Sequence, residues 1–225
     1  MPYLLRGALI EYGSDFLGPL PNVVIFQFNP ETLTRTIQIP PRPTGSASRE
    51  TDQAGELPVE KIHLTAHFSA ADAMGSNNIL ARTVGLGPQL AALEQMVHPS
   101  GKISGLIGAA IDAIGDALGI GGGEEEQATQ PIPREKFPRI LFIWGLTRVL
   151  PVVIQSMSIT EQQYDFLLNP IQAQVELDLD VITIDPCSDD KIAKGASEYS
   201  TLAKEAMAIA NLANTAQQVV ELIPF

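Results

Sequence analysis

The chain has 225 residues, of which 45% are hydrophobic and 18% are charged, a composition typical of a folded globular protein. Its 26 acidic and 14 basic residues give a formal charge of −12, which disfavours nucleic acid as a partner because a nucleic-acid interface needs a surplus of Lys and Arg. The single cysteine, Cys187, excludes an intrachain disulfide and predicts a reducing compartment.

The N-terminal residues predict no secretion signal, because the apolar stretch in MPYLLRGALIEYGSD is too short. No window reaches about 18 uncharged apolar residues, so the sequence predicts no membrane-spanning helix.

Three short strands are predicted in the first 40 residues. Residues 3–12 form the first, and the β-branched and aromatic run 23–28 forms the second. Asn29-Pro30 ends the second strand, because proline cannot donate to a sheet and asparagine accepts turn geometry. We expect this corner to direct residues 31–39 outward, as an exposed edge strand facing a neighbouring subunit or layer.

Residues 40–58 predict a mobile loop, since they hold four prolines and few apolar residues. Residues 59–70 then alternate, with Ile62, Leu64, Ala66 and Phe68 on one face and Lys61, His63, Thr65 and His67 on the other. This alternation predicts a half-buried strand. Apolar residues at helical spacing predict a helix over residues 87–98.

Residues 100–136 are rich in Gly and Ala and end in GGGEEE, which predicts an insertion. It contains one weak amphipathic helix at 103–120, with glycines that each cost about 1 kcal/mol relative to alanine. The charges of this helix are acidic, whereas interfacial helices carry Lys or Arg, so a flexible insertion or a partner-docking helix is favoured over membrane contact.

Strands resume at residues 137–145 and 148–160, and residues 171–181 show the strictest alternation in the chain. The expected polar face consists of Gln172, Gln174, Glu176, Asp178 and Asp180. Period-two strands and few helices predict a mainly β fold with α additions, built as an antiparallel barrel or sandwich with one flanking helix.

The last segment, residues 188–225, predicts a helical extension to a β-domain of residues 1–187. An apolar stripe recurs at steps of four and three, as in helices that pack closely against one another. Its members are Leu202, Ala206, Ile209, Ala213, Ala216 and Val220.

No catalytic, cofactor or metal site is predicted. On a strand, His63 and His67 lie about 13 Å apart, too far to share one ion. The acids of 178–190 lack the glycine-centred loop of a calcium site, and GIGGGEEE lacks the lysine of a phosphate-binding loop. Cys187 has no matched histidine nearby.

Three stretches together carry a resemblance: IFQFNPETLTRT (25–36), FPRILFIWG (137–145) and VIQSMSITEQQYDFLLNPIQAQVELDLDV (153–181). They resemble the tube-like domain of baseplate proteins in contractile injection systems and contractile phage tails, over roughly residues 3–185. The matching residues are Phe28, Asn29, Pro30, Pro138, Phe142, Trp144, Gly145, Phe166, Pro170 and Ala173.

The resemblance implies a non-enzymatic tube adaptor, with six copies forming a hexameric ring between the inner tube protein and the spike protein, beside other baseplate or sheath subunits. It also implies assembly in the bacterial cytoplasm as part of a phage-tail-like particle, which is later released or membrane-attached. Relatives often carry a peptidoglycan-binding LysM domain after the barrel. This sequence has an alanine-rich helix there instead, so cell-wall binding is not predicted.

Two alternatives remain open. One is an adaptor that docks to a membrane or a partner through residues 103–120 or the C-terminal helix. The other is an enzyme on a small barrel, which requires a nucleophile–base pair or perturbed acids in a pocket.

Overall fold

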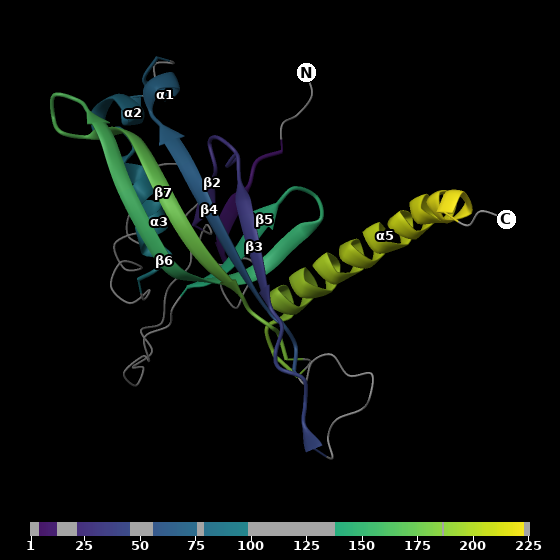
Figure 1. The fold of residues 1–225 in the computed structure, drawn as a ribbon. Helices are drawn as coiled ribbons and strands as arrows, with labels where there is room; N and C mark the ends of the chain where they lie inside the picture. The colour runs from purple at the N-terminus through teal and green to yellow at the C-terminus, as the bar shows by residue number, and fades with distance from the viewer. Residues whose placement is uncertain are drawn as a thin grey trace, which may run out of the picture.

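The chain is mainly β, with one seven-stranded antiparallel sheet and several helices, as the sequence predicts (Figure 1). The computed structural model describes residues 5–12, 22–45, 56–75, 79–98, 138–185 and 187–222, and every structural statement below concerns these residues. The predicted insertion at 100–136, with its helix at 103–120, therefore lies outside them, as does most of the predicted loop 40–58.

The strands follow the sheet order β2-β1-β5-β6-β7-β4-β3. The long β6–β7 hairpin and β4 form its centre, and short strands lie at both ends. Their bounds are β1 Ala8–Tyr12, β2 Val23–Ile25, β3 Leu33–Gln38, β4 Val59–Ser69, β5 Arg139–Trp144, β6 Arg148–Tyr164 and β7 Pro170–Val181.

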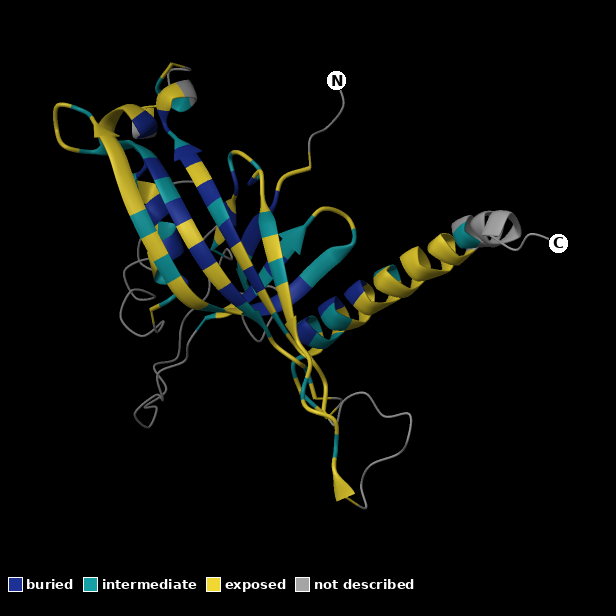
Figure 2. Cartoon of the chain, in the orientation of Figure 1, coloured by how far each residue is buried: buried dark blue, intermediate teal, exposed yellow. Residues whose placement is uncertain are grey.

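Alternation along β4 and β7 decides which face of the sheet is buried. Figure 2 shows buried and exposed residues in alternating bands along both strands. The buried face of β4 consists of Ile62, Leu64, Ala66 and Phe68, and that of β7 consists of Ala173, Val175, Leu177 and Leu179. Both predicted core faces are thereby confirmed, because a strand side chain can face only one side of its sheet.

Within the described residues three helices lie between β4 and β5, where the sequence predicts one besides the helix at 103–120. The predicted helix is α3 (Gly87–Gln95), which buries Leu90 and Leu93. The other two are α1 (Ala71–Gly75) and α2 (Ile79–Val84). They escaped prediction because one or two turns are too short to show a helical period.

The strands form one sheet that does not close into a barrel, which corrects the expected closure. β2 pairs only with β1 and β3 pairs only with β4, so the two strands are opposite edges of the sheet. The edges approach each other at one point, where Phe28 forms a single bridge with His67. Closing the sheet would require β2 to pair with β3, but β2 has three residues and β3 has six. Each edge strand therefore keeps an unpaired side.

The predicted C-terminal helix is α5 (Lys191–Leu222), and it projects from one end of the sheet (Figure 1). Its first three turns pack against β6, where the Ser200 hydroxyl donates to the Val149 carbonyl at 2.7 Å. Asp190 caps the helix by accepting from the Ala193 N–H at 3.0 Å. Its other carboxylate oxygen accepts from Tyr12 on β1 and Arg139 on β5, which fixes the start of α5 to the sheet.

A second attachment of α5 is an ion-pair cluster around Glu60 on β4. The Arg35 Nε lies 2.7 Å from one carboxylate oxygen, and the Lys204 Nζ lies 3.4 Å from the other. Burial raises the pKa of Glu60, but the Arg35 hydrogen bond and the Lys204 charge outweigh burial and hold the pKa below its ordinary 4.5.

Glu60 is therefore expected to stabilise the fold in a pH-dependent way. Because its folded pKa is depressed, its contribution is present above the unfolded pKa and is lost as the pH falls through the folded pKa. We expect Glu60→Gln to cost up to about 1 kcal/mol at neutral pH and progressively less below about pH 4. Urea unfolding at several pH values measures this difference.

The matched control is Glu176→Gln, because Glu176 lies on the exposed face of β7 and joins no ion pair among the described residues. An equal, pH-independent loss in both variants would contradict the role given to Glu60.

Candidate functional site

The most distinctive surface is the polar face of the sheet centre. Each predicted polar residue of β7 lies directly opposite a polar residue of β4. In order from one end, Asp180 faces Lys61, Asp178 faces His63, Glu176 faces Thr65, Gln174 faces His67 and Gln172 faces Ser69. The acids and amides of β7 thus share one face with the basic residues of β4, and we call these ten residues the polar face.

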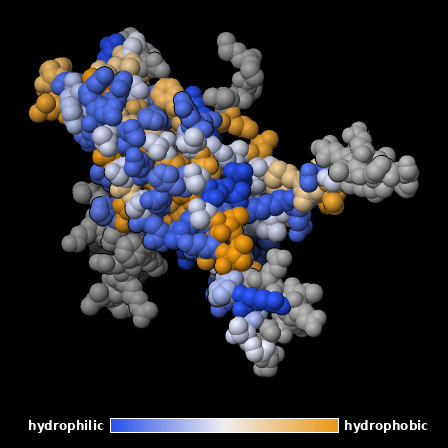
Figure 3. All heavy atoms as spheres, in the orientation of Figure 1, coloured by the Kyte–Doolittle hydropathy of each residue, from blue (hydrophilic) through white to orange (hydrophobic). Residues whose placement is uncertain are grey.

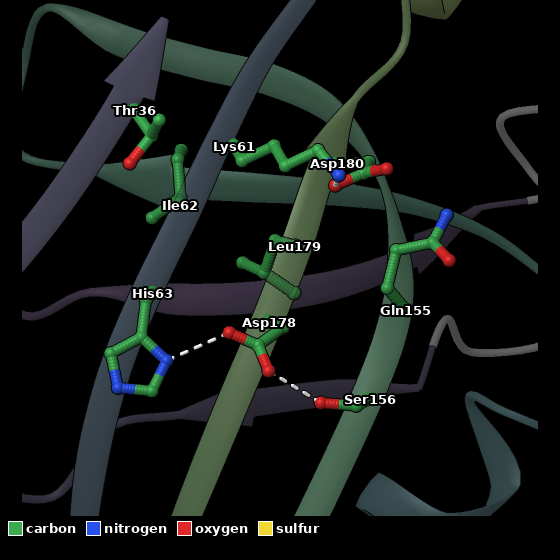
Figure 4. Close-up of a pocket in the computed structure, with 9 residues that line it drawn as sticks. All are labelled: Thr36, Lys61, Ile62, His63, Gln155, Ser156, Asp178, Leu179 and Asp180. Atoms are coloured by element: carbon green, nitrogen blue, oxygen red, sulfur yellow. Dashed lines mark hydrogen bonds and ion pairs between the residues drawn. The ribbon is translucent and has the colours of Figure 1, made fainter. Parts of the chain in front are cut away.

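The polar face contains a hydrogen-bonded group centred on Asp178 (Figure 4). One of its carboxylate oxygens lies 2.7 Å from the His63 Nδ1, and the other accepts from the Ser156 hydroxyl at 2.5 Å. The Lys61 Nζ lies 3.9 Å from the Asp180 carboxylate nearby. The hydrogen bonds that Asp178 makes, first with Ser156 and then with His63, hold the pKa of Asp178 below its usual range. Asp178 is therefore an anion at neutral pH.

A β-bulge in β6 places Ser156 in this group. The pairing of β6 with β7 shifts between Ile154, which lies opposite Leu179, and Ser156, which lies opposite Asp178. Gln155 is the extra residue of the bulge. Without the bulge, Gln155 would lie opposite Asp178 in the place of Ser156. The residues around the bulge enclose an open depression of about 410 Å³. It is lined by Thr36, Lys61, Ile62, His63, Gln155, Ser156, Asp178, Leu179 and Asp180 (Figure 4).

The geometry of the group does not match a nucleophilic relay. In such a relay the imidazole lies between the hydroxyl and the carboxylate, so that it can remove the hydroxyl proton. Here the carboxylate of Asp178 lies between Ser156 and His63 and binds both. The arrangement fixes side chains on a wet sheet face and leaves the serine hydroxyl bonded to the carboxylate and not to the imidazole.

A metal or cofactor site is not assembled in the described part of the chain. No cluster of three or more His, Cys, Asp or Glu side chains there is close enough to hold an ion. His63 and His67 have separate neighbours, because His63 contacts Asp178 and His67 lies opposite Gln174. Cys187 is exposed and free, next to the turn that precedes α5.

The Asn29-Pro30 corner, one of the motifs in the resemblance, makes its polar contacts within the chain. Asn29 accepts from the Gly7 N–H at 3.0 Å through its side-chain oxygen, and it donates to the Leu5 carbonyl at 2.8 Å. Pro30 is buried. The corner thus connects the residues just before β1 to the segment that runs from β2 to β3. The exposed edge strand predicted after the corner is confirmed, because β3 is an end strand of the sheet and most of its residues are exposed. That it faces a neighbouring subunit stays a prediction.

The second motif is part of the core. Phe142 is fully buried and stacks on Trp144, with ring centroids 5.8 Å apart. Trp144 is half-buried and covers Gly7, where an added Cβ would lie 2.7 Å from the indole ring. Gly145 has a φ of +68° in the turn to β6, and Pro138 lies just before β5.

The third motif forms the β6–β7 turn, whose apolar side chains face solvent. Phe166 is 89% exposed and Leu168 is 78% exposed, whereas Ala173 is buried in β7, three residues after Pro170. Asp165 holds the turn by accepting from the Leu167 and Asn169 N–H groups at 2.7 and 2.8 Å. The turn therefore presents apolar side chains on an ordered backbone (Figure 3).

Further apolar side chains are exposed on the two edge strands. Val23 and Ile25 on β2 are 42% and 55% exposed, and Ile37 on β3 is 52% exposed. Sequence reasoning did not single these residues out, and it also missed the Asp178 and Glu60 clusters. The alternation of 23–25 and 33–38 was the available signal for the edge residues, but only the strand order identifies β2 as an edge.

A scan against protein-family models matches no family, and a search of the curated proteins finds no relative. No helix among the described residues has both the length and the hydropathy needed to cross a membrane.

Proposed function

We propose that the protein is a structural subunit of a contractile injection system baseplate, forming a hexameric ring that joins the inner tube to the spike and the surrounding subunits. The observation that carries this proposal is the open sheet, whose end strands β2 and β3 each pair on one side only within the described part of the chain. Unpaired edges are aggregation hazards unless they are covered or paired, and pairing edge to edge with copies of the same chain satisfies both in a closed ring.

The distribution of apolar residues supports edge pairing. Exposed Val23 and Ile25 lie on one edge strand, and exposed Ile37 lies on the other. A contact that joins β2 of one copy to β3 of the next would remove all three from water. The motif resemblance supplies the ring size and the neighbours.

In this proposal the polar face lines the channel. Asp178 and Glu176 are exposed there, and the basic side chains of β4 keep the face mixed in charge. A wet, mixed-charge wall suits passage of a polypeptide without adhesion. The Asp178 group does not support the catalytic alternative as a Ser-His-Asp relay, since the Ser156 hydroxyl donates to the carboxylate and not to the imidazole.

The proposal is tested by imaging the purified chain in negative stain and measuring its native mass, alone and together with the tube and spike proteins from the same locus. We expect six-fold rings, and we expect Ile25→Lys to abolish them by placing a charge on the β2 edge. The matched control is Val153→Lys, because Val153 is 45% exposed but lies within the sheet on β6. Rings that survive Ile25→Lys, or a chain that never assembles with either protein, would contradict the proposal.

The second candidate is an adaptor that docks through the C-terminal helix. It is favoured by one specific observation, the exposure of Leu202, Ile209 and Leu212 on α5. A chain that forms no ring but binds another protein through α5 would identify it.

A further inference from the structure

Helix α5 packs on its own sheet through one face only. The residues that it buries there are Ala193, Ala196 and Ser200. They lie within one sector of the helix, because residues three and four apart share a face. The Tyr199 hydroxyl, at the edge of that sector, donates to the Leu146 carbonyl.

A second apolar stripe on α5 has no partner among the described residues. Leu202 is 64% exposed and Ile209 is 66% exposed, with exposed Ala206 between them. At 100° per residue, this stripe lies roughly 140° around the helix from the buried sector. Packing against the chain's own sheet therefore does not explain why the stripe is apolar. Figure 3 shows hydrophobic residues on the part of α5 that extends beyond the sheet.

The spacing of the stripe is that of a coiled coil. Ile192, Gly195, Tyr199, Leu202, Ala206 and Ile209 follow one another at alternating steps of three and four residues, and the sequence continues the pattern through Ala213, Ala216 and Val220. A pattern with seven-residue periodicity fits another helix with the same repeat. Alanine at core positions 206, 213 and 216 allows two such helices to approach closely.

Charge narrows the choice of partner. Residues 206–220 contain no Asp, Glu, Lys or Arg, although the chain as a whole carries a formal charge of −12. Anionic lipid and nucleic acid select helices with basic residues, so neither suits residues 206–220 of α5 as a partner. In two copies of the chain, residues 206–220 have no charges that repel each other. Because α5 extends away from the sheet, two copies of α5 can pair while the two β-sheet domains, which carry most of the acidic residues, remain apart (Figure 1).

We infer that α5 forms a coiled coil with α5 of a second copy of this chain, through the stripe of Leu202, Ala206 and Ile209. In proteins most of the stability of a helix comes from packing of its apolar face, and the second copy supplies that packing. This contact is separate from the sheet edges, and it does not rest on the proposed baseplate role.

The test compares two lysine variants at neighbouring positions of the full-length chain. Ile209→Lys places a charge in the coiled-coil core, whereas Ala208→Lys places the same charge on the outer side of the helix. Sedimentation over a range of concentrations is expected to show self-association of the natural chain and of Ala208→Lys. We expect Ile209→Lys to weaken it at least about tenfold, because a lysine at a core position of a coiled coil is costly. Position 209 is exposed in the single chain, so both variants retain the body's fold, which circular dichroism checks.

Both comparisons are repeated in the Ile25→Lys background, where the β2 edge is blocked, so that failure of ring formation and failure of helix pairing are told apart. A photo-crosslinking residue at position 205 identifies the surface in contact, and we expect links to α5 of the other copy. A chain that stays monomeric throughout, equal behaviour of the two lysine variants, or crosslinks that map to the sheet would each overturn the inference.

Discussion

Replacing Phe142 by alanine is expected to lower the free energy of unfolding by about 3–5 kcal/mol. The side chain is fully buried between Phe26, at a centroid distance of 6.5 Å, and Trp144, at 5.8 Å. Truncation removes the apolar contacts and leaves a cavity between two rings, one just after β2 and one on β5, which cannot collapse together. Chemical denaturation followed by tryptophan fluorescence measures the loss, because Trp144 is the single tryptophan of the chain and lies at the site.

The matched control is Phe166→Ala in the β6–β7 turn. This side chain is 89% exposed, so its removal is expected to change stability by less than about 0.5 kcal/mol. Similar losses of unfolding free energy in the two variants would mean that the contribution of Phe142 to stability does not come from its burial.

Gly85→Ala is expected to be the most damaging single-methyl change in the described part of the chain. Gly85 has a φ of +58° between α2 and α3, a conformation that costs an L-residue roughly 1–2 kcal/mol. In addition, the new Cβ would lie 2.4 Å from the carbonyl oxygen of Pro170, which accepts the Leu86 N–H. The methyl group would therefore force α3 away from the start of β7, and we expect a total loss of about 3 kcal/mol.

Gly87→Ala provides the comparison, since it adds the same methyl group two residues later. No atom lies within 4 Å of the added Cβ, and Gly87 is in the first turn of α3. We expect it to be neutral or to stabilise the fold by up to about 1 kcal/mol. Thermal melting of both variants checks the pair, and an equal shift would contradict the role of the Pro170 contact.

Prediction from the sequence succeeded where the pattern is local. The period of two in residues 59–70 and 171–181 identified both strands and their buried faces, since side chains alternate across a sheet whatever the neighbouring strands are. Prediction of the helix at 87–98 and of the C-terminal helix also succeeded, because each is long enough to show a helical period. The short helices α1 and α2 offered no such signal.

The candidate site was predictable only in part. The polar residues of β7 were identified by alternation, whereas Ser156 joins Asp178 through a bulge that no local pattern shows. The Glu60 cluster joins Arg35, Glu60 and Lys204 from three elements, and no sequence spacing connects them.

The sequence by itself thus determined which segments become strands and helices, which face of each is apolar, and the seven-residue spacing along α5. Only the tertiary structure decided that β2 and β3 become the two edges of the sheet, that the sheet stays open, and that the stripe on α5 points away from its own sheet. The physical reason is that alternation and helical spacing depend on neighbours in sequence, whereas strand order and register depend on which distant segments pair, and several pairings satisfy the same alternation.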